Sequence, residues 1–173
     1  MSKRLLASLA AVLMMVSVSM GQKAPSKADA TAADVLSLVY SPDTGNLSVD
    51  LGSAGAGALA NLTTLEIRSA GGNFTGTKPP QLTGLFDVYN ANKLFKLDPA
   101  GFGSIDLGPA LAPGLGGDAL LADLLVDGSF VGGGGVGAVP VALVHPDFMV
   151  PEPSSMVMVA LGLLSVAGLR RRR

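Results

Sequence analysis

Hydrophobic and polar residues alternate along much of the middle of the chain, which is the pattern of a strand that buries one face. The clearest example is a pair of runs at residues 36–40 and 47–51, in which every second residue is apolar. The intervening segment, residues 42–46, contains Pro42 and Gly45, and both residue types favour turns. The pair therefore predicts a β-hairpin.

Further short runs predict strands at residues 64–68, 74–76, 82–89, 93–97, 102–107 and 139–145. Leucines at helical spacing predict one helical turn near 119–123, followed by a strand that enters the glycines at 132–135. Eight or nine strands joined by Gly-rich turns predict an all-β ectodomain over residues 34–150. We expect a single two-layer antiparallel β-sandwich. Residues 22–33 lack an apolar period and are expected to form a flexible leader.

The alternation also predicts which side chains fill the core, because one face of each strand must be buried. A domain of this length can bury enough surface to be stable without a disulfide. The predicted core consists of Leu38, Val49, Leu65, Ile67, Phe86, Val88, Phe95, Leu97, Ile105, Leu107, Val126, Val141 and Leu143.

The first segment, residues 1–21, has the order of charges and apolar residues that is typical of a secretory signal peptide. Two basic residues precede an apolar run over 5–18, and small residues follow at 19 and 21. This order predicts a cut between Gly21 and Gln22 by signal peptidase. A permanent anchor is the less favoured alternative, because a span needs about 20 apolar residues.

The last segment, residues 151–173, combines a short polar motif, an apolar stretch and a basic tail. In order it contains Pro151, Glu152, Pro153 and Ser154, an apolar stretch over 156–169, and Arg170, Arg171, Arg172 and Arg173. The apolar stretch predicts a short transmembrane helix. Because basic residues stay on the cytoplasmic side, the arginines place the preceding domain outside the membrane. An ordinary tail anchor is the alternative.

This final segment resembles the PEP-CTERM protein-sorting domain of Gram-negative bacteria. The resemblance implies that an exosortase, a membrane-embedded transpeptidase-like enzyme, recognises Pro151, Glu152 and Pro153 and cleaves nearby. It implies delivery to the cell envelope or extracellular matrix after transient anchoring in the inner membrane. More loosely, the ectodomain resembles secreted planctomycete-type PEP-CTERM proteins and cohesin-like sandwiches.

Composition narrows the chemistry that the chain can support. With no cysteine and one histidine, the chain has no disulfide framework, thiolate metal site or histidine cluster. Residues 22–150 carry six basic and twelve acidic side chains. This excess of negative charge disfavours nucleic-acid binding but is compatible with divalent cations or uncharged polysaccharide.

The remaining candidate motifs favour structure over chemistry. The G-x-G-x-x-A pattern at 55–60 is interpreted as a flexible loop, and His145, at a strand end, as a surface residue. Asp43, Asn46 and Asp50 could offer oxygen ligands to calcium but do not match a calcium-loop motif. We therefore expect an exported, non-enzymatic protein with no cofactor, metal or catalytic residue. The alternative is a carbohydrate- or calcium-binding module, with exopolysaccharide as a candidate partner.

Overall fold

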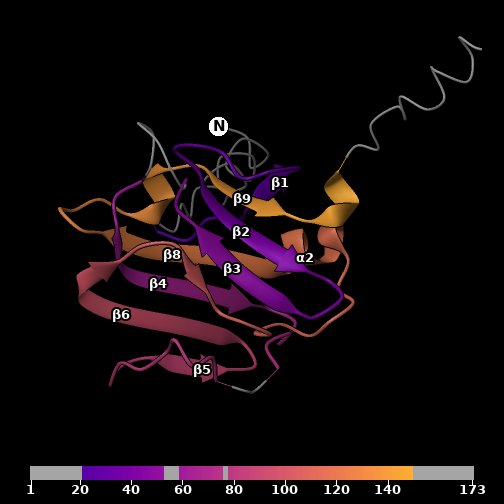
Figure 1. Ribbon diagram of the computed structural model, residues 1–173, viewed down its shortest axis with the longest axis horizontal. Coiled ribbons are helices and arrows are strands. Elements are labelled where there is room, and N and C mark those ends of the chain that lie inside the picture. Colours follow the sequence, from indigo (N-terminus) through magenta and orange to yellow (C-terminus); the bar gives the residue numbers. More distant parts are fainter. Residues whose placement is uncertain (1–20, 53–58, 76–77, 150–173) are drawn as a thin grey trace, which may run out of the picture.

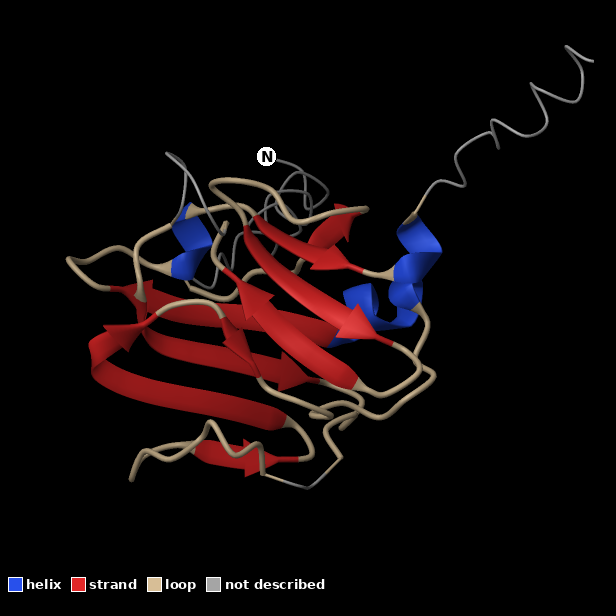
Figure 2. Cartoon of the chain, viewed as in Figure 1, coloured by secondary structure: helices blue, strands red, loops and turns tan. Residues whose placement is uncertain are grey.

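The computed structural model describes residues 21–52, 59–75 and 78–149, which form a mostly β fold with two sheets (Figures 1 and 2). One sheet has the strand order β1-β9-β2-β3-β7, and the other has the order β5-β6-β4-β8. The elements are β1 (Ser26–Ala28), β2 (Leu36–Ser41), β3 (Asn46–Asp50), β4 (Leu62–Ser69), β5 (Val88–Asn90), β6 (Lys93–Phe102), β7 (Ile105–Asp106), α2 (Gly117–Asp123), β8 (Leu124–Phe130), η1 (Val136–Ala138), β9 (Val141–Val144) and η2 (Pro146–Phe148).

The hairpin expected from the first two runs is present as β2 and β3. The two strands are antiparallel, with Leu38 opposite Val49 and Tyr40 opposite Leu47. All four of these side chains are buried. Gly45 in the turn has a φ of 71°, and a Cβ at this position would lie 2.2 Å from the carbonyl oxygen of Leu111. The turn therefore requires glycine both for its backbone angle and for the close approach.

The expected antiparallel arrangement holds for only one of the two sheets. The β5-β6-β4-β8 sheet is antiparallel throughout, whereas β9 runs parallel to both β1 and β2. All four residues of β9 are buried, and its sequence is apolar without alternation. A strand with this composition is typical of a parallel sheet, because both of its faces are covered.

The segment expected to be a flexible leader, residues 22–33, instead takes part in the fold. Lys23 forms two backbone hydrogen bonds with Val126 at the edge of β8, of 2.7 and 2.9 Å. A few residues later, β1 pairs with β9 in the other sheet. The alternation rule missed this strand because it is three residues long and contains no large apolar side chain.

The predicted helical turn and the strand after it are confirmed as α2 and β8. Leu120 and Leu124 are buried, which explains the helical spacing of the leucines. The following loop contains three consecutive glycines at 132–134 with φ between 87° and 100°. This conformation is open to glycine and disfavoured for other residues.

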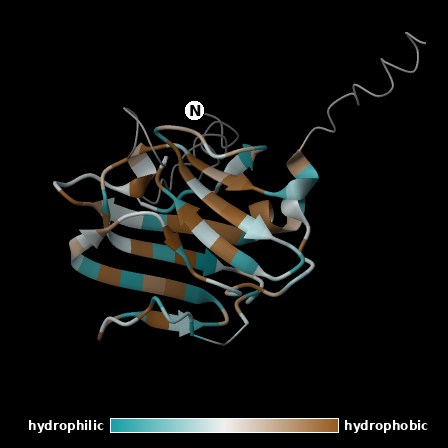
Figure 3. Cartoon of the chain, in the orientation of Figure 1, coloured by the Kyte–Doolittle hydropathy of each residue, from teal (hydrophilic) through white to brown (hydrophobic). Residues whose placement is uncertain are grey.

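Both sheets contribute to one hydrophobic core. Of the predicted core residues, those that are buried in it are Leu38, Val49, Leu65, Ile67, Leu107, Val126, Val141 and Leu143. Ile105 is partly buried against this cluster. The bands of hydrophobic and hydrophilic residues along β4 and β6 in Figure 3 reflect the alternation between the two faces of the sheet.

Four predicted core residues are wrong, and they all lie on or near β5 and β6. Phe86 is 66 % exposed and Val88 is 40 % exposed. Phe95 and Leu97 are only half-buried, because the pairing of β6 with β4 places Leu94 and Lys96 on the core side instead. A lysine at a core position is the feature that the polarity pattern could not anticipate.

Lys96 is tolerated in this position because its ammonium group has partners. Its Nζ donates to the carbonyl oxygen of Gln81 at 3.1 Å and lies 4.0 Å from the buried carboxylate of Asp87. It also lies 5.2 Å from the ring centroid of Phe102. Burying a charged group costs far less free energy when the group has such partners than when it is isolated.

The two expected terminal helices cannot be placed in this fold. The apolar run at 5–18 and the apolar stretch at 156–169 lie outside the described residues. Among the residues that are described, no helix combines the length and hydrophobicity needed to cross a membrane.

Candidate functional site

The candidate sorting residues, Pro151–Ser154 and Arg170–Arg173, also lie outside the described residues. The described chain ends at Met149, two positions before Pro151. The described part of the chain nearest the motif is a junction that consists of β9, His145 and the short helix η2. Among the described elements, η2 is the last one before the motif.

His145 anchors the junction from inside the protein. The side chain is 1 % exposed, so the expectation that it lies on the surface is wrong. Its Nδ1 accepts a hydrogen bond from the backbone N–H of Asp147 at 3.0 Å, and its Nε2 donates to the carbonyl oxygen of Leu115 at 3.0 Å. The ring also stacks on Tyr40, with 5.5 Å between centroids. Both ring nitrogens are thus used to fix the chain.

The residues of η2 pack closely against the start of α2. The Oδ2 atom of Asp147 accepts a hydrogen bond from the backbone N–H of Gly117 at 2.8 Å. A Cβ on Gly117 would lie 2.5 Å from the ring of Phe148, so only glycine allows this approach. Together with His145, these contacts fix the chain direction immediately before Met149.

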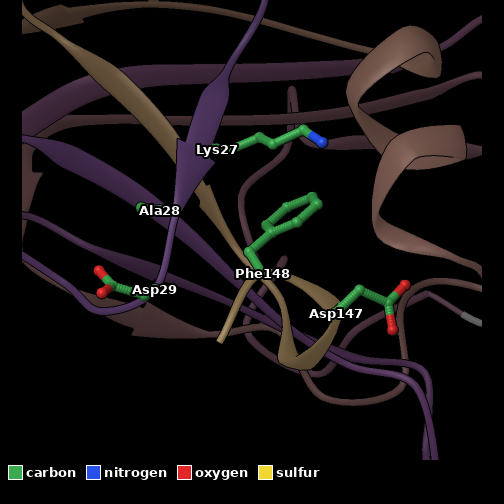
Figure 4. A pocket seen from close by; sticks show the side chains of 5 residues that line it. All are labelled: Lys27, Ala28, Asp29, Asp147 and Phe148. Carbon is green, nitrogen blue, oxygen red and sulfur yellow. The ribbon is translucent and has the colours of Figure 1, made fainter. Parts of the chain in front are cut away.

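An open pocket of about 400 Å³ lies beside this junction and is lined by Lys27, Ala28, Asp29, Asp147 and Phe148 (Figure 4). In Figure 4, Lys27 extends over the ring of Phe148, whereas Asp29 points away from it. The ammonium of Lys27 lies 5.0 Å from the ring centroid and 2.6 Å from the carboxylate of Asp118. The pocket is thus lined by side chains of both charges and by one aromatic ring, and it lies between β1 and η2.

At the other predicted processing site, Gly21 and Gln22 lie against the antiparallel sheet. Gly21 has a φ of 140°, and a Cβ on it would approach Oδ2 of Asp127 to 2.8 Å. Next to it, Nζ of Lys23 donates to the carbonyl oxygen of Val139 at 2.6 Å. The predicted cut therefore falls where the chain joins the folded body.

Two carboxylates have pKa values below their ordinary range. For Asp123, partial burial alone would raise the pKa, but hydrogen bonds from Ser69, Gly71, Asn73 and Ala70 outweigh it and lower the pKa. These bonds tie the turn after β4 to the end of α2.

For Glu66, burial likewise opposes ionisation, and the neighbouring Lys93 and Arg68 reverse the effect and lower the pKa. The ammonium of Lys93 lies 2.8 Å from Oε2 of Glu66, and the Arg68 guanidinium contacts Oε1. Both of these carboxylates are therefore ionised structural groups at neutral pH.

The candidate calcium ligands are not brought together. Asn46 begins β3 and Asp50 ends it. At a rise of about 3.3 Å per residue, their backbones lie roughly 13 Å apart. Asn46 donates to Asp106, and Asp50 accepts from the backbone N–H of Gly52. Among the described residues, no group of three or more His, Cys, Asp or Glu side chains could hold a metal ion. Most of the 55–60 motif lies outside the described residues.

Comparison with known proteins bears on the C-terminal segment. A family model described as the PEP-CTERM protein-sorting motif matches residues 150–173. No curated protein and no solved structure matches the chain. The motif implies exosortase-dependent sorting of an exported protein that transits the membrane. The resemblance seen in the sequence is thereby confirmed: residues 150–173 carry a PEP-CTERM protein-sorting motif.

Proposed function

We propose that the chain is an exported, non-enzymatic component of the cell envelope or extracellular matrix. Signal peptidase cuts between Gly21 and Gln22, residues 156–169 hold the chain in the inner membrane, and an exosortase cleaves at the Pro151–Ser154 motif. The match to the sorting motif at residues 150–173 is the observation that carries this proposal.

The geometry of the junction supports processing close to the folded body. Seven residue steps separate Met149 from Met156, and an extended chain covers at most about 3.6 Å per step. The end of the protein that bears η2 and α2 therefore stays within about 25 Å of the membrane segment. The exosortase would meet the motif beside this end, not on a long free tether.

We propose that the protein is not an enzyme, because its histidine side chain has a structural role. His145 is the chain's single histidine, and both of its ring nitrogens bind backbone groups. A histidine that acts as a general base needs a ring nitrogen that can reach substrate. His145 therefore has no free ring nitrogen with which to activate a serine nucleophile.

Exosortase processing is tested by substituting the acidic residue of the motif. Glu152→Gln removes the charge and keeps the size, so we expect the exported protein to retain its C-terminal segment and stay in the membrane fraction. Asp43→Asn, which makes the same change in an exposed turn, serves as the control. Intact mass and membrane fractionation measure both. If Glu152→Gln is cleaved and released like the unchanged protein, the proposed role of the motif is wrong.

A second candidate function is binding of uncharged polysaccharide, supported by an exposed apolar surface near β5. Leu85 is 91 % exposed and Phe86 is 66 % exposed, and clustered exposed apolar side chains commonly mark interaction sites. In Figure 1, β5 lies at the bottom and the yellow helix η2 at the upper right, so the two elements lie at opposite ends of the view.

The turn that carries these two residues is well ordered by its own contacts. Oδ2 of Asp87 accepts from the backbone N–H of Gly84 at 2.8 Å, and Oδ1 accepts from Leu97 at 2.9 Å. Phe86→Ala should therefore remove binding to neutral polysaccharide without unfolding the turn, as measured by affinity electrophoresis. If neutral polysaccharide retards Phe86→Ala and the unchanged protein equally, binding of polysaccharide at this surface is without support.

A further inference from the structure

Gln22, the residue after the predicted signal-peptide cut, lies beside a guanidinium group. With its amide oxygen oriented toward Arg68, Gln22 accepts hydrogen bonds from Nη1 at 2.9 Å and from Nε at 3.2 Å. This orientation follows from the donors that face the amide. The carbonyl of the Gln22 side chain is therefore held by two N–H groups that carry positive charge.

A carboxylate lies beside the preceding residue, Gly21. A Cβ placed on Gly21 would be 2.8 Å from Oδ2 of Asp127. This carboxylate therefore adjoins the peptide bond between Gly21 and Gln22. The α-amino nitrogen of Gln22 that this cut frees is bonded directly to the residue whose side-chain amide Arg68 holds, and it comes from the peptide bond that follows Gly21, beside Asp127.

We propose that the processed protein carries pyroglutamate at its N terminus, formed from Gln22 at this site. The α-amino nitrogen attacks the Cδ atom of its own side chain, forming the C–N bond of a five-membered lactam. The bond from Cδ to the amide nitrogen breaks, and ammonia leaves. The step needs no oxidant or further reactant.

Arg68 and Asp127 supply the two polar functions that this reaction needs. The Arg68 guanidinium stabilises the negative charge that develops on the amide oxygen, as donors in an oxyanion hole do. The Asp127 carboxylate accepts the proton of the attacking nitrogen and returns it to the leaving nitrogen. The backbone pairing of Lys23 with Val126 restricts the conformations open to the neighbouring Gln22, which favours the reactive geometry.

Pyroglutamate would also protect the N-terminal segment, which pairs with both sheets. The segment from Lys23 to β1 bridges the edge of β8 and the edge of β9. An aminopeptidase acting on a free N terminus would remove the residues that make these contacts. A lactam has no free amine and resists such enzymes.

The proposal is tested on residues 22–173, purified in detergent after release from a fusion partner that leaves no residue before Gln22. Intact mass follows the loss of ammonia with time. Acid–base assistance contributes about 10²-fold or more to such steps, so the folded chain should cyclise at least about tenfold faster than the same chain in urea. The rate should rise with pH as the α-amine deprotonates, near its ordinary pKa of about 8.

Matched variants separate the chemistry from general stability. Arg68→Ala and Asp127→Asn should slow cyclisation toward the rate measured in urea. Lys93→Ala should not change the rate, because Lys93 contacts Glu66 on the same sheet face but has no bond to Gln22. Arg68→Lys keeps a positive charge beside Glu66 and replaces Arg68→Ala if that variant does not fold. Partial recovery of the rate by Lys supports a direct role for the charge.

Several results would overturn the proposal. Equal rates in the folded and unfolded chains would show that Arg68 and Asp127 give no assistance. The exported protein with an intact amine on Gln22 would refute cyclisation and leave the proposed cut in place. An exported protein that begins at another residue would refute both, while the proposed processing at Pro151–Ser154 would still stand.

Discussion

Substitution of Asp123 tests the contact between the turn after β4 and the end of α2. The carboxylate accepts hydrogen bonds from the hydroxyl of Ser69, the backbone N–H of Gly71 and the amide of Asn73. Asp123→Asn replaces one accepting oxygen with an NH₂ group, which would face donors that it cannot bind. The change keeps the shape of the side chain and removes its charge.

The magnitude follows from the bonds that are lost. A hydrogen bond to a charged group contributes about 1.5–3 kcal/mol, and partial exposure of Asp123 lets water compensate for part of the loss. We therefore expect Asp123→Asn to lower the free energy of unfolding at pH 7 by about 2 kcal/mol. Urea unfolding followed by circular dichroism measures this, with Asp43→Asn in an exposed turn as the control.

The same variant predicts how the effect depends on pH. Because the pKa of Asp123 is lower in the folded protein than the ordinary value near 4, its ionised form stabilises the fold above pH 4. This stabilisation is lost as the pH falls through the lowered pKa of the folded state. The difference between the two proteins should therefore shrink below pH 4. A difference that stays constant from pH 7 to pH 3, or that is absent at pH 7, would refute the role assigned to the carboxylate.

Three further substitutions test packing, a buried hydrogen bond and an exposed residue. Gly128→Ala should lower the free energy of unfolding by about 2 kcal/mol or more, because its Cβ would lie 2.4 Å from the backbone oxygen of Thr64. Tyr40→Phe should cost about 1–3 kcal/mol, since the carbonyl of Ala112 loses a 2.6 Å hydrogen bond. Leu85→Ser should change stability by less than about 0.5 kcal/mol, because Leu85 is almost fully exposed. Thermal or urea unfolding measures all three.

The sequence was most informative where the signal is local. The hairpin of β2 and β3 was predictable because its turn residues and its alternation lie within sixteen consecutive positions. The sorting motif was predictable for the same reason, since a short motif, an apolar stretch and a basic tail follow one another directly. Neither inference requires knowledge of which distant segments meet.

Prediction failed where a distant partner decides which face of a strand is buried. In β6, the pattern allowed either Phe95 or Leu94 to face the core, and pairing with Ile67 of β4 selects Leu94. The same register turns Lys96 inward, where a backbone carbonyl from outside the strand satisfies it. A one-residue shift exchanges the two faces of a strand, so the polarity pattern alone could not settle this case.

The candidate site was hidden from the sequence for a related reason. His145 lies 30 positions from Leu115, whose carbonyl it binds. Gln22 lies even farther along the chain from Arg68 and Asp127. Single residues of these types carry no pattern, so only the fold reveals which of them are in contact. The lack of large side chains in β1 similarly concealed the role of residues 22–33.

The contacts of β1 also connect the two ends of the chain at which processing is proposed. β1 pairs with β9, and β9 continues through His145 into η2, which ends three positions before Pro151 of the sorting motif. Lys27 of β1 lies over the ring of Phe148 in η2. If the N-terminal segment does not dock, β9 loses its neighbour at the sheet edge and η2 loses this contact. We therefore expect presentation of the motif to an exosortase to depend on residues near the opposite end of the sequence.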